Sequence, residues 1–155
     1  LDGTGGVLGR AGPTAYRSDS YLPYVGLMQF DIADAERYDG RGLFDDIVLH
    51  EMMHCMGFGT MWGQMGLLSA DRTRFLGDNA ALADQALFDG DGGGLLVETY
   101  GGSGTAGSHW DEARYDGELM TGYIDGANTF SDMSIAALED MGYDTVFDPA
   151  NYLVA

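Results

Sequence analysis

Residues 48–59 read VLHEMMHCMGFG, and this apolar run contains a His-Glu-x-x-His motif. Residues four apart lie on the same face of an α-helix, so a helix here would present His50 and His54 to one metal ion. Glu51 lies one position further round, where its carboxylate can reach a water molecule beside the metal. Because imidazole nitrogen suits zinc, the motif predicts a zinc centre with a carboxylate next to it.

The sequence on both sides of the motif predicts a buried helix from about Leu43 to Met56. Apolar side chains would cover nearly every side of this helix, whereas a surface helix carries only an apolar stripe. They are Leu43, Phe44, Ile47, Val48, Leu49, Met52, Met53 and Met56. Two histidines and a glutamate in such a helix would be costly without partners, and a metal ion removes that cost. We therefore favour a metal site over histidines that are simply hydrogen-bonded within the core.

A zinc ion that performs chemistry needs three protein ligands and one open position. The chain has three histidines, and the one outside the motif is His109. We therefore expect His109 to be the third ligand rather than a surface or helix-capping residue. Acidic side chains also bind zinc, so Glu139 and Asp84, each on a predicted helix, stay open as alternatives.

The composition limits the partners of the chain. Its 25 acidic residues face 7 basic ones, all of them arginine, and the formal net charge is −18. This charge argues against nucleic acid and anionic membranes as partners. No run reaches the roughly 18 apolar residues of a membrane span, and 155 residues fit one domain, which we expect to be a monomer. The single cysteine, Cys55, excludes an intramolecular disulfide and is expected to pack as a small buried hydrophobe.

The rest of the chain predicts short elements joined by glycine-rich loops. Residues 1–23 are expected to be irregular, with one short strand at most. Residues 24–31 predict a strand that is apolar on both faces and is therefore covered by other elements. Gly57 and Gly142 are expected to follow helices and to adopt a left-handed conformation there. The other expected elements are a helical turn at 33–38, a helix at 79–88, a strand at 95–100 and a helix at 132–141.

Residues 89–94 read DGDGGG and predict a turn. This run has some likeness to a calcium-binding loop, but it lacks the full EF-hand spacing. We therefore favour a solvated turn. Calcium (Ca2+) near Asp78, Asp89 or Asp91 stays open as a second metal besides zinc (Zn2+).

The motif His50-Glu51-x-x-His54-x-x-Gly57 resembles the metzincin clan of zinc peptidases. Thr60 stands where most of that clan carries its third histidine, so the chain departs from the common pattern. The leishmanolysin family inserts a long segment at this point, and its third histidine lies in a His-Trp context that is followed by Glu-Leu-Met. This chain is similar, because it reads Ser-His-Trp at 108–110 and Glu-Leu-Met at 118–120.

The resemblance implies an α+β fold of the metzincin-like zincin type. A small sheet would pack on the buried active-site helix, above a loop-rich lower subdomain that ends in a C-terminal helix. It implies one catalytic domain, with an upper part at about residues 1–57 and a lower part at about 58–155. Met120 would be the Met-turn residue beneath the zinc-binding histidines, and the location would be extracellular. Because few residues precede the motif and the family's cysteines are absent, we expect a minimal, processed domain.

The sequence therefore predicts a zinc-dependent endopeptidase that acts on protein or peptide substrates. His50, His54 and His109 would hold the metal, and Glu51 would be the general base. A catalytically inactive, metal-stabilised binding module derived from a peptidase is the alternative, motivated by the short N-terminal region. The intact Glu51 argues against that alternative. A zinc hydrolase acting on a non-peptide amide or ester shares the same metal chemistry and stays open.

Overall fold

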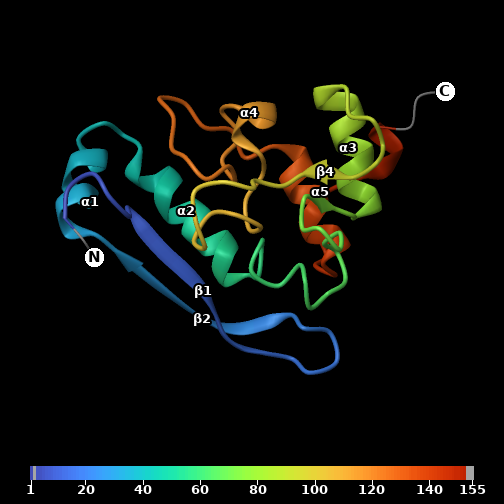
Figure 1. The fold of residues 1–155 in the computed structure, drawn as a ribbon, viewed down its shortest axis with the longest axis horizontal. Coiled ribbons are helices and arrows are strands. Elements are labelled where there is room, and N and C mark those ends of the chain that lie inside the picture. Colours follow the sequence, from blue (N-terminus) through green and yellow to red (C-terminus); the bar gives the residue numbers. More distant parts are fainter. Residues whose placement is uncertain (2, 153–155) are drawn as a thin grey trace.

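The computed structural model describes Leu1 and residues 3–152. The described chain has an α+β architecture, as expected, with two antiparallel two-stranded sheets and five α-helices. Its elements are β1 (Gly9–Tyr16), β2 (Pro23–Phe30), α1 (Ile32–Asp39), α2 (Phe44–Cys55), β3 (Arg74–Phe75), α3 (Asp78–Phe88), β4 (Leu95–Leu96), α4 (Glu112–Tyr115), α5 (Asp132–Asp140) and a final 3-10 turn (Pro149–Asn151). The β1–β2 hairpin runs alongside α2, and the α3–α5 pair lies on the other side of that helix (Figure 1).

The helices were predicted well because their signals are local. The expected helices at 43–56, 79–88 and 132–141 appear as α2, α3 and α5, each within a residue of the expected ends. Gly57 and Gly142 follow α2 and α5 with φ of 95° and 99°, as predicted. The expected strand at 95–100 is shorter, because only β4 and a single bridge between Val97 and Trp110 form.

The prediction that residues 1–23 hold one short strand at most was wrong about its length. β1 has eight residues and pairs with β2 from Gly9↔Phe30 to Tyr16↔Pro23, with an irregularity near Thr14. The length of β1 was not predicted, because its mostly small residues give no alternation of apolar and polar side chains. On β2, Gly26 lets the hairpin approach α2 closely, because a Cβ atom there would lie 2.6 Å from the Cβ of Cys55. Cys55 itself is half-buried under the hairpin, rather than fully buried as expected.

The prediction that β2 and α2 are covered on all sides was also wrong. Tyr24, Val25 and Leu27 of β2 are exposed. On α2, Leu49 is 37% exposed and Met52 is 46% exposed. The hairpin has only two strands and packs against α2, so these apolar side chains are only partly covered by the described residues.

The main hydrophobic core lies on the other side of α2. Four aromatic side chains pack together in it, with the centroids of contacting rings 4.8–5.5 Å apart, namely Phe58, Trp62, Phe75 and Trp110. Helices α3 and α5 pack against this cluster, and Asp140 of α5 accepts hydrogen bonds from the first N–H groups of α3, at Asn79 and Ala80. None of the helices in the described residues combines the length and the apolar character needed to cross a membrane.

The two tryptophans provide a matched test of this core. Trp62 and Trp110 are both fully buried. The indole N–H of Trp110 donates to Ser134 Oγ at 2.9 Å, whereas that of Trp62 has no partner among the described residues. Trp62→Phe and Trp110→Phe remove similar volumes, and only the second breaks a hydrogen bond worth about 1 kcal/mol. We therefore expect Trp110→Phe to lower the free energy of unfolding by about 1 kcal/mol more than Trp62→Phe in urea denaturation. Equal losses would contradict this account of the core.

Candidate metal centre

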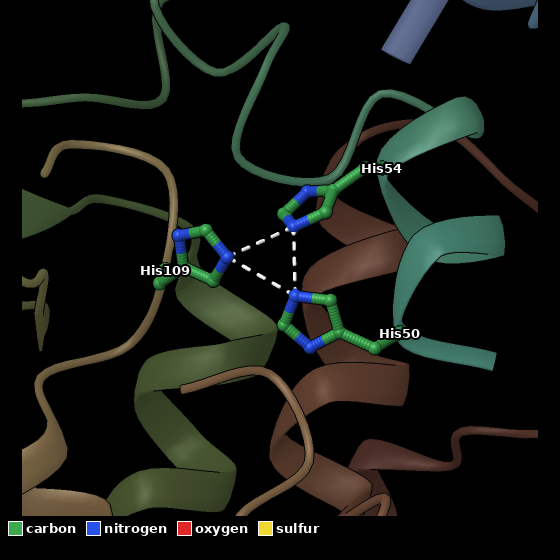
Figure 2. Close-up of side chains that lie close together, drawn as sticks. All are labelled: His50, His54 and His109. Carbon is green, nitrogen blue, oxygen red and sulfur yellow. Dashed lines mark hydrogen bonds between the residues drawn. The ribbon is translucent and has the colours of Figure 1, made fainter. Parts of the chain in front are cut away.

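Three imidazole rings from two distant parts of the chain meet at one point. Helix α2 supplies His50 and His54, and His109 comes from the loop that follows β4. The three Nε2 atoms lie 2.9–3.1 Å from one another, and Figure 2 shows all three rings pointing them inward. The structure thus brings together the three histidines that the sequence selected as metal ligands.

A main-chain carbonyl group behind each ring sets its orientation. Because a carbonyl oxygen can only accept, the proton of each ring is assigned to Nδ1, which donates to that oxygen. The pairs are His50 with Leu119 at 2.8 Å, His54 with Phe58 at 3.0 Å, and His109 with Thr105 at 3.0 Å. Every Nε2 atom is therefore left with a lone pair and no proton.

Three lone pairs that face one another in this way repel, and a cation between them removes the repulsion. Tetrahedral zinc with Zn–N distances of roughly 2.0–2.1 Å holds its ligand nitrogens roughly 3.3 Å apart. The observed separations of 2.9–3.1 Å are close to that value. The donor set therefore fits zinc, and these three histidines could hold a metal ion.

Burial keeps the three imidazoles neutral. It lowers the pKa of His50 to about 3, with a further contribution from the neighbouring His54. Burial also lowers the pKa of His54, and it lowers the pKa of His109 well below its usual range. Neutral imidazole is the form that binds metals, so no proton has to leave the rings near neutral pH before a metal binds.

Glu51 lies buried on α2 between the two histidines of the motif. Its Oε2 atom is buried and has no hydrogen-bond partner among the described residues. Burial raises the pKa of this carboxyl group to about 7. Strand β1 passes so close that a Cβ atom at Gly9 would lie 2.6 Å from Glu51 Oε1. The carboxyl group is thus confined beside the three rings with one oxygen left for a water molecule or a substrate group.

A cleft of about 820 Å³ opens over the three histidines and Glu51. Its lining includes the segment 5–11, which contains the start of β1, parts of the loop 101–108, and residues 122–124. This volume lies within the range of ligand-binding clefts. Glu51 and the three histidines therefore line one cleft.

Met120 is fully buried in the turn at residues 118–121. Its carbonyl oxygen accepts a hydrogen bond from the N–H of Trp110 at 3.0 Å, directly after His109. The carbonyl group of Leu119, one residue earlier, holds the ring of His50. The predicted Met-turn is therefore connected through its backbone to two of the three histidines.

The sequence did not reveal the carbonyl groups that orient the rings. Every residue carries a carbonyl group, so Leu119, Phe58 and Thr105 have no distinguishing residue type. In the sequence, Glu118 stands out only as the first residue of the Glu-Leu-Met motif, although its buried carboxylate accepts a hydrogen bond from Met120 N–H. The burial of a carboxylate so close to His109 in sequence cannot be seen before the fold is known.

The acidic alternatives for the third ligand lie outside this group of histidines. Glu139 accepts hydrogen bonds from the N–H and the hydroxyl of Thr145, and Asp84 is buried on α3. In the described residues, neither belongs to a group that could hold a metal ion. His109 thus occupies the place for which Glu139 and Asp84 were alternatives.

The calcium prediction is not tested by these observations. Asp91 forms an ion pair with Arg74 at 3.1 Å, and Asp89 ends α3 in a left-handed conformation. Within residues 3–152, the second group that could hold a metal ion lies elsewhere, at Glu112, Asp116 and Asp125. Calcium near Asp78, Asp89 or Asp91 therefore stays a prediction.

The fold and the site define a small α+β protein with a candidate metal centre of three histidines. A model of the leishmanolysin family of metallopeptidases matches residues 90–154, which contain His109 and Met120. A leishmanolysin homolog from Crithidia fasciculata is 31% identical to the chain over 135 residues. The match covers 78% of this chain and 20% of the length of the Crithidia protein. The two matches support a leishmanolysin-like classification of the chain.

Two glycines test how the loop of His109 is supported. A Cβ atom at Gly59 (φ 70°) would lie 1.9 Å from the carbonyl oxygen of Ser108, whereas a Cβ atom at Gly66 (φ 74°) would have no atom of residues 3–152 within 4 Å. Both alanine variants carry the left-handed strain of about 1 kcal/mol. Only Gly59→Ala also displaces the backbone next to His109. We expect Gly59→Ala to weaken zinc binding, measured by competition with a chelator, and Gly66→Ala to leave it unchanged.

Equal zinc affinities for the two variants would show that contact between Gly59 and Ser108 does not position His109. The free energy of unfolding of each variant, measured on the metal-free protein, separates this effect from a general loss of stability.

Proposed function

We propose that this chain is a zinc-dependent endopeptidase in which His50, His54 and His109 hold the metal. One observation carries the proposal. Three Nε2 lone pairs converge in a cleft that Glu51 also lines, and the buried Oε2 atom of Glu51 has no partner among the described residues. The leishmanolysin-like classification supports the same function.

Zinc supplies Lewis-acid chemistry, since it makes water a nucleophile near neutral pH and polarises a carbonyl oxygen. Glu51 is the proposed general base. Its unpaired Oε2 atom takes the proton from the attacking water and then passes it to the leaving amine. Confinement by Gly9 limits the positions of this carboxyl group, which lowers the entropic cost of aligning it for proton transfer.

The proposed substrate is an extended peptide. Strand β1 pairs with β2 along one edge, and its first residues, from Gly9 to Ala11, line the cleft. A peptide can add to an open strand edge through main-chain hydrogen bonds. This feature favours a peptide over a small amide or ester, which would not use a strand edge.

We also propose a metzincin-like arrangement of the domain around the cleft. This proposal treats residues 1–155 as one metzincin-like catalytic domain, with the β1–β2 hairpin and α2 above the cleft and the loop-rich part that ends in α5 below it. Met120 is its proposed Met-turn residue. An extracellular location and a monomeric state belong to the same proposal and follow from the family resemblance and the composition.

The decisive experiment removes the general base and leaves the metal ligands. We expect Glu51→Ala to keep one zinc ion per chain and to lose roughly 100-fold to 10,000-fold of casein cleavage. Metal analysis and a casein assay on the same preparations measure both quantities. Glu36→Ala, at an exposed position on α1, is the matched control and should keep both.

Retained cleavage in Glu51→Ala would remove Glu51 from the mechanism. Zinc without cleavage in the wild type would instead support a metal-stabilised binding module. Absence of zinc from the wild type would overturn the proposed ligand set.

A second prediction concerns the strand that confines Glu51. Gly9→Ala would push the Glu51 carboxyl group, whereas a Cβ atom at Gly12 would meet only the Thr60 methyl group at 4.0 Å. A misplacement of about 1 Å can cost roughly 100-fold in rate. We therefore expect Gly9→Ala to lower kcat strongly without loss of zinc, and Gly12→Ala to behave like the wild type. Equal kcat values for the two variants would show that β1 does not position Glu51.

A further inference from the structure

Glu118 is a buried carboxylate that the proposed reaction does not use. Its residue is 2% exposed, and in the described part of the chain no ion pair involves it. Oε1 accepts hydrogen bonds from the N–H and hydroxyl of Ser131 at 3.2 and 2.9 Å, and from the hydroxyl of Ser134 at 2.6 Å. Oε2 accepts a hydrogen bond from the N–H of Met120. Burial raises the pKa of this carboxyl group, and the four donors offset part of the cost of burying its charge.

The hydrogen bond from Met120 leads directly to the candidate metal centre. The N–H of Met120 and the C=O of Leu119 belong to one peptide group, and this C=O accepts from His50 Nδ1 at 2.8 Å. The described chain has no cis peptide bonds, so the N–H and C=O of this group point in opposite directions. Glu118, the peptide group and the His50 ring therefore form one continuous hydrogen-bonded chain.

A charged group at one end of such a hydrogen-bonded chain changes the strength of the hydrogen bond at the other end. The carboxylate polarises the peptide group, so the Leu119 oxygen becomes a stronger acceptor for His50 Nδ1–H. A stronger hydrogen bond at Nδ1 raises the basicity of the ring and fixes its orientation. Carboxylates that bind a ligating histidine directly have this effect on metal affinity. Here one peptide group lies between the carboxylate and the ring.

We infer that Glu118 is a positioning residue for His50, acting through the Leu119–Met120 peptide group to orient the ring and strengthen Nε2 as a metal ligand. This inference rests on the proposed metal centre. His109 offers a comparison within the same site. Its Nδ1 atom donates to the Thr105 oxygen at 3.0 Å and also lies 3.1 Å from the hydroxyl of Ser108. The N–H of the Thr105–Ala106 peptide group donates to a neutral carbonyl oxygen at 2.8 Å.

The test separates the charge of Glu118 from its part in packing. Glu118→Gln keeps the size of the side chain and one oxygen acceptor but removes the charge. Ser131→Ala is the matched control, because it removes a donor to the same carboxylate and leaves its charge and its bond to Met120. We expect Glu118→Gln to weaken zinc binding by roughly 10-fold to 100-fold in a chelator competition. Ser131→Ala should lose stability and keep the wild-type dissociation constant.

Zinc affinity that falls equally in both variants, in step with the free energy of unfolding, would overturn the inference in favour of a purely structural role. Wild-type affinity in Glu118→Gln would overturn it as well. In both cases the wild type would still bind zinc and cleave casein, so the proposed function would stand. A wild type that binds no zinc would remove both proposals together.

A measurement on the wild type keeps the inference testable if Glu118→Gln fails to fold. The Nδ1 protons of His50 and His109 can be compared by NMR in the zinc-loaded protein. We expect the His50 proton to resonate further downfield, because its carbonyl acceptor is polarised by a carboxylate. An equal or upfield position for His50 would overturn the inference.

Discussion

The meeting of three imidazole lone pairs is the constraint on which the rest of the structure depends. Each ring is held by a carbonyl group from a different place: the turn at 118–121, the end of α2, and the loop at 102–108. These segments gain their positions from the aromatic core around Trp110 and from the packing of α3 against α5. Without a cation the arrangement stores repulsion, so metal binding and folding should stabilise each other.

Close backbone approach is the second requirement of the site. The protein meets it with glycines at points where a side chain would collide with a functional group. Gly9 brings β1 against the Glu51 carboxyl group, and Gly59 brings the segment after α2 against Ser108, beside His109. The same close packing buries much of the carboxyl group and the rings, and this burial shifts their pKa values away from the ordinary ones.

The sequence was enough to predict the features that depend on the spacing of nearby residues or on the number of residues of one type. The spacing of His50 and His54 locates α2, and the number of histidines points to His109. Sequence reasoning missed β1, because small residues carry no periodic signal, and it missed the orienting carbonyl groups, because every residue has one. It also assumed that an apolar side chain is a buried side chain. Leu49 and Met52 show the limit of that step, since an apolar side chain is buried only where another element covers it.

The acidic side chains are stabilised mainly by groups other than cationic side chains. Buried carboxylates accept from N–H groups instead: Glu98 from Thr99 and Tyr100, and Asp34 from Gly5. With seven arginines against 25 acidic residues, few positive side chains are available. A divalent cation held by three neutral histidines would therefore enter a field that is negative overall, which favours its binding. We infer that Glu118 adds to this effect at short range, because only one peptide group lies between its carboxylate and the His50 ring.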